Sequence, residues 1–150
     1  MTNNDTLAML KHDVTQFNKF RHDNPAVVPD FSGGDLSGTN LAQADLNRAN
    51  LAGANLQRAN LQGANLGNAN LERADLRGAD LTSATLHRAR LQGVDLRGAK
   101  VGGFESEGRV CIHVSSFRGV KWDKEQIEAM LRTINENERW HIKYEITPKE

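Results

Sequence analysis

Large apolar residues recur at every fifth position through the middle of the chain, from Phe31 to Val101, without a break in register. In a typical unit, Ala54-Asn55-Leu56-Gln57-Arg58, a small residue and a polar residue precede the apolar centre. A step of five turns about 140° around an α-helix and changes face along a β-strand, so neither element would bury all the centres together. A bend in every unit satisfies the pattern, with three extended residues followed by a two-residue corner. The units then stack into a narrow coil with an apolar interior.

The predicted core is the series of unit centres. It comprises Phe31, Leu36, Leu41, Leu46, Leu51, Leu56, Leu61, Leu66, Leu71, Leu76, Leu81, Leu86, Leu91, Leu96 and Val101. Burial of one leucine side chain contributes roughly 1.5 to 3 kcal/mol to stability. A coil with one leucine in most units can therefore be stable although aromatic residues make up only 5% of the chain.

Units of the form A(D/N)LXX, such as ADLNR, ANLQG and ANLER, resemble those of the pentapeptide-repeat family and cover about half of the chain. The resemblance implies a mainly β fold, a right-handed quadrilateral β-helix with four units in each coil. Phe31, Leu51, Leu71 and Leu91 would then stack along one side, at the strand spacing of about 4.8 Å. The handedness and the four sides are implications of the resemblance, whereas the bend in every unit follows from the spacing of the centres.

The limits of the regular repeat divide the chain into three predicted parts. Residues 1–29 form an N-terminal helical cap, residues 30–102 the β-helix and residues 103–150 a C-terminal cap. In the N-terminal part, apolar residues at helical spacing predict one amphipathic helix from about Asp5 to Arg21. These residues are Leu7, Leu10, Val14 and Phe17. Because the first coil of a solenoid has an open edge, we expect the helix to cover it, in preference to binding a partner or a membrane surface.

The C-terminal part combines a loop, irregular repeats, a helix and a strand. Two irregular units are predicted to resume at residues 115–119 and 120–124. Asp123 and Gln126 form a capping-box pattern at the start of the predicted helix. The final strand carries an apolar row, formed by Trp140, Ile142, Tyr144 and Ile146. We favour packing of this row on the helix, and hence a monomer, over the alternative of a homodimer formed through this cap.

The residue before each centre is mostly Asn or Asp and would form columns in a four-sided coil. Asn50 and Asn70 are expected to hydrogen-bond as a structural ladder pair. One column, which contains Asp35, Asn55, Asp75 and Asp95, could attract a cation or imitate a row of phosphates. Arg77 and Arg97 lie two residues after the last two carboxylates, so we expect a self-compensated network in place of an acidic ligand face or a metal site.

The second corner position holds glycine in some units and arginine in others, for example Gly53 and Arg58. A position that accepts arginine should not strictly demand the positive φ that glycine adopts easily. We therefore interpret these glycines as turn residues and not as a phosphate-binding loop.

Basic and acidic residues are balanced, with nineteen of each, and no segment concentrates one sign. This balance argues against nucleic-acid binding, which requires clustered Lys and Arg. No apolar run approaches the roughly 20 residues that span a bilayer, so no membrane association is expected. The single Cys111 and the lack of a signal-peptide pattern at the N-terminus predict a cytoplasmic location.

The sequence contains no arrangement of residues that is typical of a catalytic or metal site. Cys111 and His113 lack the further ligands of a closed zinc site, and a leucine-filled coil leaves no concave substrate pocket. No catalysis and no cofactor are therefore expected, and the leading hypothesis is a solenoid that presents a rigid polar surface to an unidentified protein partner. The resemblance suggests one alternative, a DNA mimic that binds DNA gyrase or another topoisomerase. It is disfavoured because residues 31–101 contain eight basic and six acidic residues. An unrecognised enzyme is the remaining alternative.

Overall fold

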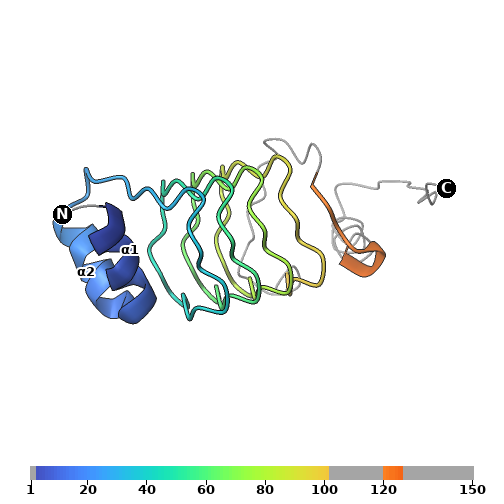
Figure 1. Cartoon of the computed structure of the whole chain (residues 1–150), viewed down its shortest axis with the longest axis horizontal. Helices are drawn as coiled ribbons and strands as arrows, with labels where there is room; N and C mark the ends of the chain where they lie inside the picture. The colour runs from blue at the N-terminus through green and yellow to red at the C-terminus, as the bar shows by residue number, and fades with distance from the viewer. Residues whose placement is uncertain (1–2, 102–119, 127–150) are drawn as a thin grey trace, which may run out of the picture.

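The structure is a computed structural model that describes residues 3–101 and 120–126. Two helices, α1 (Asn3–His12) and α2 (Val14–Asp23), lie side by side at one end of a row of stacked coils (Figure 1). The coils follow one another along a common axis, so this part of the molecule is a short rod. Neither helix is long and apolar enough to cross a lipid bilayer.

The coil is four-sided, because parallel pairs join residues that are 20 positions, or four units, apart. Asp30 pairs with Asn50, for example, and Asn50 pairs with Asn70. Each unit contributes one bridging residue before the chain turns, so the described residues form isolated β-bridges and no extended strand. The β character of the fold therefore lies in these bridges and in the backbone hydrogen bonds between coils.

Each side of the rod is named after its leucine in the second coil. The Leu51 face carries Phe31, Leu51, Leu71 and Leu91; the Leu56 face carries Leu36, Leu56, Leu76 and Leu96; the Leu61 face carries Leu41, Leu61, Leu81 and Val101; the Leu66 face carries Leu46, Leu66 and Leu86. Thirteen of these centres are buried, and Leu86 and Val101 are partly buried against the same core. Alanines two positions before the centres fill the space beside them.

The corners are β-turns whose third residue has a positive φ, as in type II turns. The N–H of Ala54 closes one such turn on the carbonyl of Leu51 at 3.0 Å, with Gly53 at φ 65°. Arg58 and Arg73 occupy the same position with φ of 55° and 58°. The expectation that a position that accepts arginine does not demand a positive φ is therefore wrong, because glycine and arginine both adopt it here. A left-handed conformation costs a non-glycine residue about 1 to 2 kcal/mol, which the backbone bonds on both sides of each coil offset.

At two of these glycines, a side chain of the preceding coil lies close to the space that a Cβ atom would occupy. A Cβ atom added to Gly63 would lie 2.0 Å from Nε2 of Gln43, which extends from the preceding coil. A Cβ on Gly93 would lie 3.4 Å from Cγ of Arg73. Long corner side chains thus lie across the glycine of the next coil.

The N-terminal segment forms two helices where the sequence predicted one. Asp13 has an extended backbone, with φ −149°, and caps α2 by accepting hydrogen bonds from the N–H groups of Thr15 and Gln16 at 2.9 and 3.0 Å. Aspartate is a preferred N-cap because its carboxylate satisfies N–H groups that have no partner within the helix. The apolar stripe still converges, since Leu10 and Phe17 are buried and the Phe17 ring centre lies 6.0 Å from that of Phe31.

Polar side chains of the helices bond the open backbone edge of the first coil. Asn18 donates to the carbonyl of Gln43 and accepts from the N–H of Asp45, each at 2.8 Å. Arg21, only 6% exposed, donates to the carbonyls of Asp45 at 3.3 Å and Asn47 at 2.9 Å, and to that of Val27. These side chains take the place of a preceding coil.

At the other end, the chain returns to the Leu56 face. Lys121 pairs with Asp95, 26 residues earlier instead of 20, so the irregular unit at 120–124 follows an insertion. Residues 124–126 are helical, and Oε1 of Gln126 accepts from the N–H of Asp123 at 3.0 Å, as in a capping box. Nε2 of Gln126 donates to the carbonyls of Leu96 at 2.7 Å and Ala99 at 2.6 Å. The predicted unit at 115–119 lies outside the described residues.

Candidate interaction surface

The outward Asn and Asp side chains form hydrogen-bonded ladders along the rod. Nδ2 of Asn70 donates to Oδ1 of Asn50 at 3.2 Å, which confirms the expected ladder pair, and Nδ2 of Asn50 donates to Oδ1 of Asp30 at 3.0 Å. Oδ1 of Asn50 also accepts from the N–H of Ala52 at 3.3 Å, within its own unit. Each amide therefore supports a turn and joins two coils.

Where aspartate replaces asparagine in the third coil, a glutamine supplies the missing donor. Gln57 donates from Nε2 to Oδ2 of Asp75, and Gln62 does the same for Asp80, both at 2.9 Å. Local sequence patterns do not predict these pairs. Their signal is a glutamine 18 positions before an aspartate, which has meaning only once the number of units in a coil is known.

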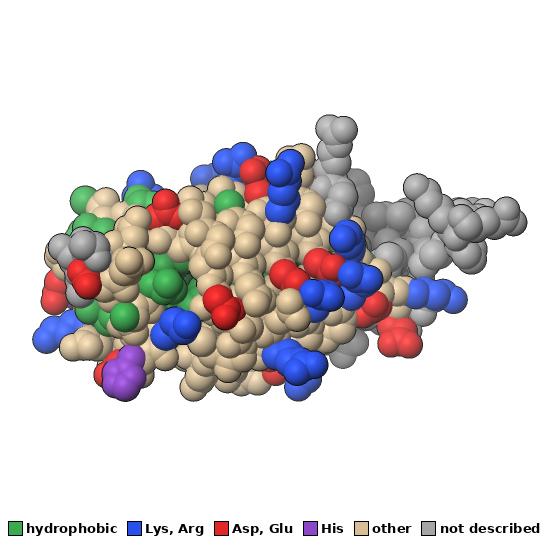
Figure 2. Space-filling view, in the orientation of Figure 1, with side chains coloured by type: hydrophobic (Ala, Val, Ile, Leu, Met, Phe, Trp, Pro, Cys, Tyr) green, Lys and Arg blue, Asp and Glu red, His purple; other side chains and the backbone are tan. Residues whose placement is uncertain are grey.

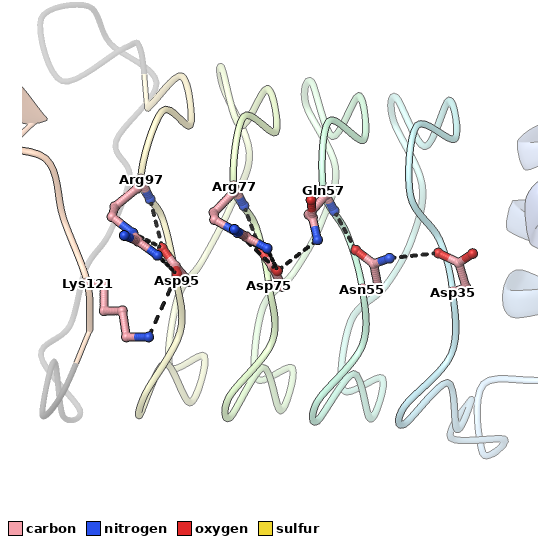
Figure 3. A network of polar contacts seen from close by, with 8 residues as sticks. All are labelled: Asp35, Asn55, Gln57, Asp75, Arg77, Asp95, Arg97 and Lys121. Carbon is pink, nitrogen blue, oxygen red and sulfur yellow. Dashed lines mark hydrogen bonds and ion pairs between the residues drawn. The ribbon is translucent and has the colours of Figure 1, made fainter.

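The Leu56 face carries the column of acidic residues, and its charges compensate one another (Figure 3). Nη2 of Arg77 lies 2.7 Å from Oδ2 of Asp75, and Nη2 of Arg97 lies 2.6 Å from Oδ2 of Asp95. Hydrogen bonds from these arginines hold the pKa of both carboxyl groups below its usual value, although partial burial acts in the opposite direction. At Asp75, the negative charge of Asp95 also opposes the lowering of the pKa. Lys121 adds a third cation, with Nζ 3.9 Å from Oδ2 of Asp95. The expected self-compensated network is confirmed.

The third coil also contains a strongly stabilised carboxylate, that of Asp80. Hydrogen bonds from Thr82 and Gln62 lower its pKa from 3.8 to about 2. Because the folded-state pKa lies below the unfolded one, the ionised carboxylate stabilises the fold above about pH 4, and this contribution is lost as the pH falls toward 2.

We expect Asp80→Asn to flatten the acid side of the stability profile. The difference in free energy of unfolding between wild type and variant should change between about pH 5 and pH 2 and stay constant above pH 5, as measured by urea unfolding. Thr82→Val, which keeps the carboxyl group but removes its strongest donor, should flatten the same region in part. Parallel profiles for wild type and Asp80→Asn would contradict the lowered pKa.

Four arginines differ from those on the Leu56 face because their side chains have no ion-pair or hydrogen-bond partner in the described part of the chain. All are exposed and occupy the second corner position; they are Arg48, Arg58, Arg73 and Arg88. In Figure 2, basic side chains project at the edges of the rod, whereas acidic and basic side chains are interspersed on the face toward the viewer. The corners thus present positive charge that no acidic side chain of residues 3–101 and 120–126 neutralises.

Several sequence-predicted residues lie outside the described ranges. They are Cys111, His113, Trp140, Ile142, Tyr144 and Ile146. Among residues 3–101 and 120–126, no group of three or more His, Cys, Asp or Glu residues is placed to hold a metal ion. The contacts of Asn18 and Arg21 with the first coil, and those of Gln126 with the carbonyls of Leu96 and Ala99, are not predicted by the sequence. Helical periodicity identifies apolar stripes and not the polar residues beside them.

Comparison with known proteins identifies the repeat. The profile of the family described as Pentapeptide repeats matches eight copies, over residues 30–63 and 59–98. A pentapeptide repeat protein of the Arabidopsis thaliana thylakoid lumen, whose crystal structure is known, is 30% identical, with a TM-score of 0.50 over 69% of this chain and 72% of that one. The chain belongs to the pentapeptide repeat family.

Other solved structures also resemble this pentapeptide repeat protein. HetL of Nostoc sp. strain PCC 7120, involved in heterocyst differentiation regulation, is 34% identical over 61% of this chain, with a TM-score of 0.49. The match spans only 38% of HetL. QnrB1, a plasmid-mediated fluoroquinolone resistance protein, is 16% identical with a TM-score of 0.38, over 69% of this chain and 64% of that one. No curated protein sequence matches the chain.

Proposed function

We propose that this pentapeptide repeat protein is a non-catalytic scaffold that presents a rigid polar surface to a protein partner. The observation that carries the proposal is the fixed geometry of its outward side chains. Backbone bonds join successive coils in every regular unit, and Asn ladders such as Asp30–Asn50–Asn70 hold the side chains between the corners in columns. A surface that is already ordered loses little conformational entropy when a partner binds.

The finer features of the fold belong to the same proposal. Membership in the family supports right-handed winding of the coil. The contacts of Arg21 and Gln126 with backbone carbonyls support capping roles for residues 1–29 and 103–150 around a β-helix at 30–102. A monomer in the cytoplasm completes the proposal, and the location needs direct measurement because one similar protein comes from the thylakoid lumen.

Affinity capture tests the scaffold function. The full-length protein, immobilised through a C-terminal tag, should retain one protein species from a lysate of its native host in a stoichiometric amount. The same protein immobilised after thermal unfolding is the control and should not retain it, because the columns exist only in the fold. Recovery of nucleic acid without protein, or equal retention by the unfolded control, would contradict the proposal.

We expect no effect of this protein on DNA gyrase. A mimic of duplex DNA presents negative charge, whereas the unpaired charges of the described corners are arginines. In a supercoiling assay, equimolar protein should neither inhibit gyrase nor protect it from a quinolone. Inhibition or protection at that ratio would favour the DNA-mimic alternative and displace the scaffold proposal.

A further inference from the structure

Basic and acidic residues balance in number, but they differ in how they are engaged. Each of the seven acidic residues in residues 30–101 accepts a hydrogen bond or forms an ion pair. They are Asp30, Asp35, Asp45, Glu72, Asp75, Asp80 and Asp95. Of the eight basic residues in the same range, Arg77, Arg90, Arg97 and Lys100 form ion pairs, and the side chains of the four corner arginines pair with none of the residues that the structure describes. The charge that remains available to a partner is therefore positive.

Three of the four unpaired arginines border one side of the rod. Arg48 and Arg88 occupy the corner between the Leu66 and Leu51 faces, two coils apart in the same column. Arg73 occupies the opposite edge of the Leu51 face, at its corner with the Leu56 face. Arg58 lies at the corner between the Leu56 and Leu61 faces and does not border the Leu51 face.

The middle of the Leu51 face, between its two edges, carries side chains that are neutral or paired with one another. Its polar column begins with Asp30, which accepts from Asn50, and continues with Asn70. On the same face, Arg90 forms an ion pair with Glu72. A ligand on this face would therefore meet bonded polar groups along its middle and unpaired guanidinium groups along both edges.

We propose that the Leu51 face, with Arg48, Arg73 and Arg88, docks an acidic, extended segment of a protein partner. Coils stack at about 4.8 Å, so Arg48 and Arg88 are separated by about 9.6 Å along the rod. In a polyproline II segment, every third side chain lies on the same side, about 9.3 Å further along. Carboxylates three residues apart therefore match the two arginines on one edge. Each guanidinium can bind a carboxylate through two parallel hydrogen bonds. The inference rests on the proposed scaffold function and identifies the chemistry of the partner.

A protein segment fits this face better than a nucleic acid does. Nucleic-acid binding relies on dense positive charge along a continuous phosphate backbone. Here the unpaired cations on one edge are two coils apart, and Asp30 and Glu72 lie between the edges. Isolated arginines are suited to individual carboxylates, and arginine is enriched among the residues that dominate protein–protein binding energy.

Fluorescence anisotropy with a defined probe tests the proposal. The probe is a fluorescein-labelled peptide of Glu-Pro-Pro repeats, which holds glutamates three apart in a polyproline II conformation. The triple variant Arg48→Gln, Arg73→Gln, Arg88→Gln should bind it at least about tenfold more weakly than wild type. Glutamine is compatible with the turn, because Gln43 occupies the same position with φ 62°. Arg58→Gln is the matched control and should bind like wild type.

Three results would overturn the proposal. The first is equal affinity of wild type and the triple variant for the Glu-Pro-Pro probe. The second is that wild type binds a peptide of the same composition, but with its glutamates adjacent, as tightly as it binds the probe. The third is that wild type binds a single-stranded oligonucleotide of equal charge more tightly than the probe. The proposed function is tested separately by affinity capture. A native partner that the triple variant retains fully would disprove the Leu51 face and leave the scaffold intact. If the peptide binds through the three arginines but affinity capture finds no native partner, the Leu51 face is supported and the scaffold function is contradicted.

Discussion

Replacement of Leu66 by alanine is expected to lower the free energy of unfolding by about 2 to 5 kcal/mol, the range for large-to-small changes in a core. Leu66 is fully buried in the second coil, so it has a neighbouring coil on each side. The interior is too narrow to collapse around the lost side chain without breaking backbone bonds such as that from the Leu66 N–H to the carbonyl of Thr85, at 2.8 Å. Urea unfolding followed by circular dichroism measures the loss.

Asn68 supplies the comparison, because it lies in the same unit and is exposed. Its φ of 57° changes the expected size of the effect of Asn68→Ala. Alanine tolerates the left-handed region less well than asparagine does. This change should therefore lower the free energy of unfolding by about 1 to 2 kcal/mol, whereas an exposed substitution without a backbone effect would leave it unchanged. Asn68→Gly is the better control and should be nearly neutral, since glycine is common at this position. Equal destabilisation by Leu66→Ala and Asn68→Gly would contradict the inward placement of Leu66.

Deletion of residues 1–25 is expected to make the protein aggregate. The deletion removes Phe17 from its contact with Phe31 and uncovers the first ring of apolar centres. It also removes Asn18 and Arg21, which leaves the backbone edge at residues 43–47 without partners. An open edge of this kind pairs readily with other chains. Size-exclusion chromatography with light scattering should show large species or loss of soluble protein.

A single substitution distinguishes the polar contacts that the two helices make with the first coil from their apolar contacts. Arg21→Met keeps a long buried side chain but loses the bonds to the carbonyls of Asp45 and Asn47, and should destabilise the protein by roughly 1.5 to 3 kcal/mol. Lys19→Met, at an exposed position on α2, is the control and should change stability little. A deletion variant that stays monomeric with unchanged melting temperature, or equal effects of the two substitutions, would show that the helices do not cap the coil.

Some features of the candidate surface could be predicted before the coil was known. The pairing of Asp75 with Arg77 and of Asp95 with Arg97 is local, since partners two residues apart in an extended segment are neighbours whatever the rest of the chain does. The unpaired state of Arg48 and Arg88 could not be predicted in this way. It depends on which acidic residues are already bonded across coils, and the relevant separation of about 20 residues is invisible to local patterns.

The sequence by itself determined the repeat, its apolar centres and its bend in every unit, because a strict period of five excludes both regular elements as a way to bury the centres. It also determined that the polar residue before each centre points outward, because side chains alternate along the extended part of each unit. Which of these residues form one column depends on the four units of each coil, which the pairs 20 residues apart establish. Only the tertiary structure decided the left-handed corners at Arg58 and Arg73 and the role of Arg21. These features depend on hydrogen bonds to a neighbouring coil, and such bonds exist only when distant segments are brought together. The break at Asp13 is local, because its carboxylate accepts from the N–H groups of Thr15 and Gln16.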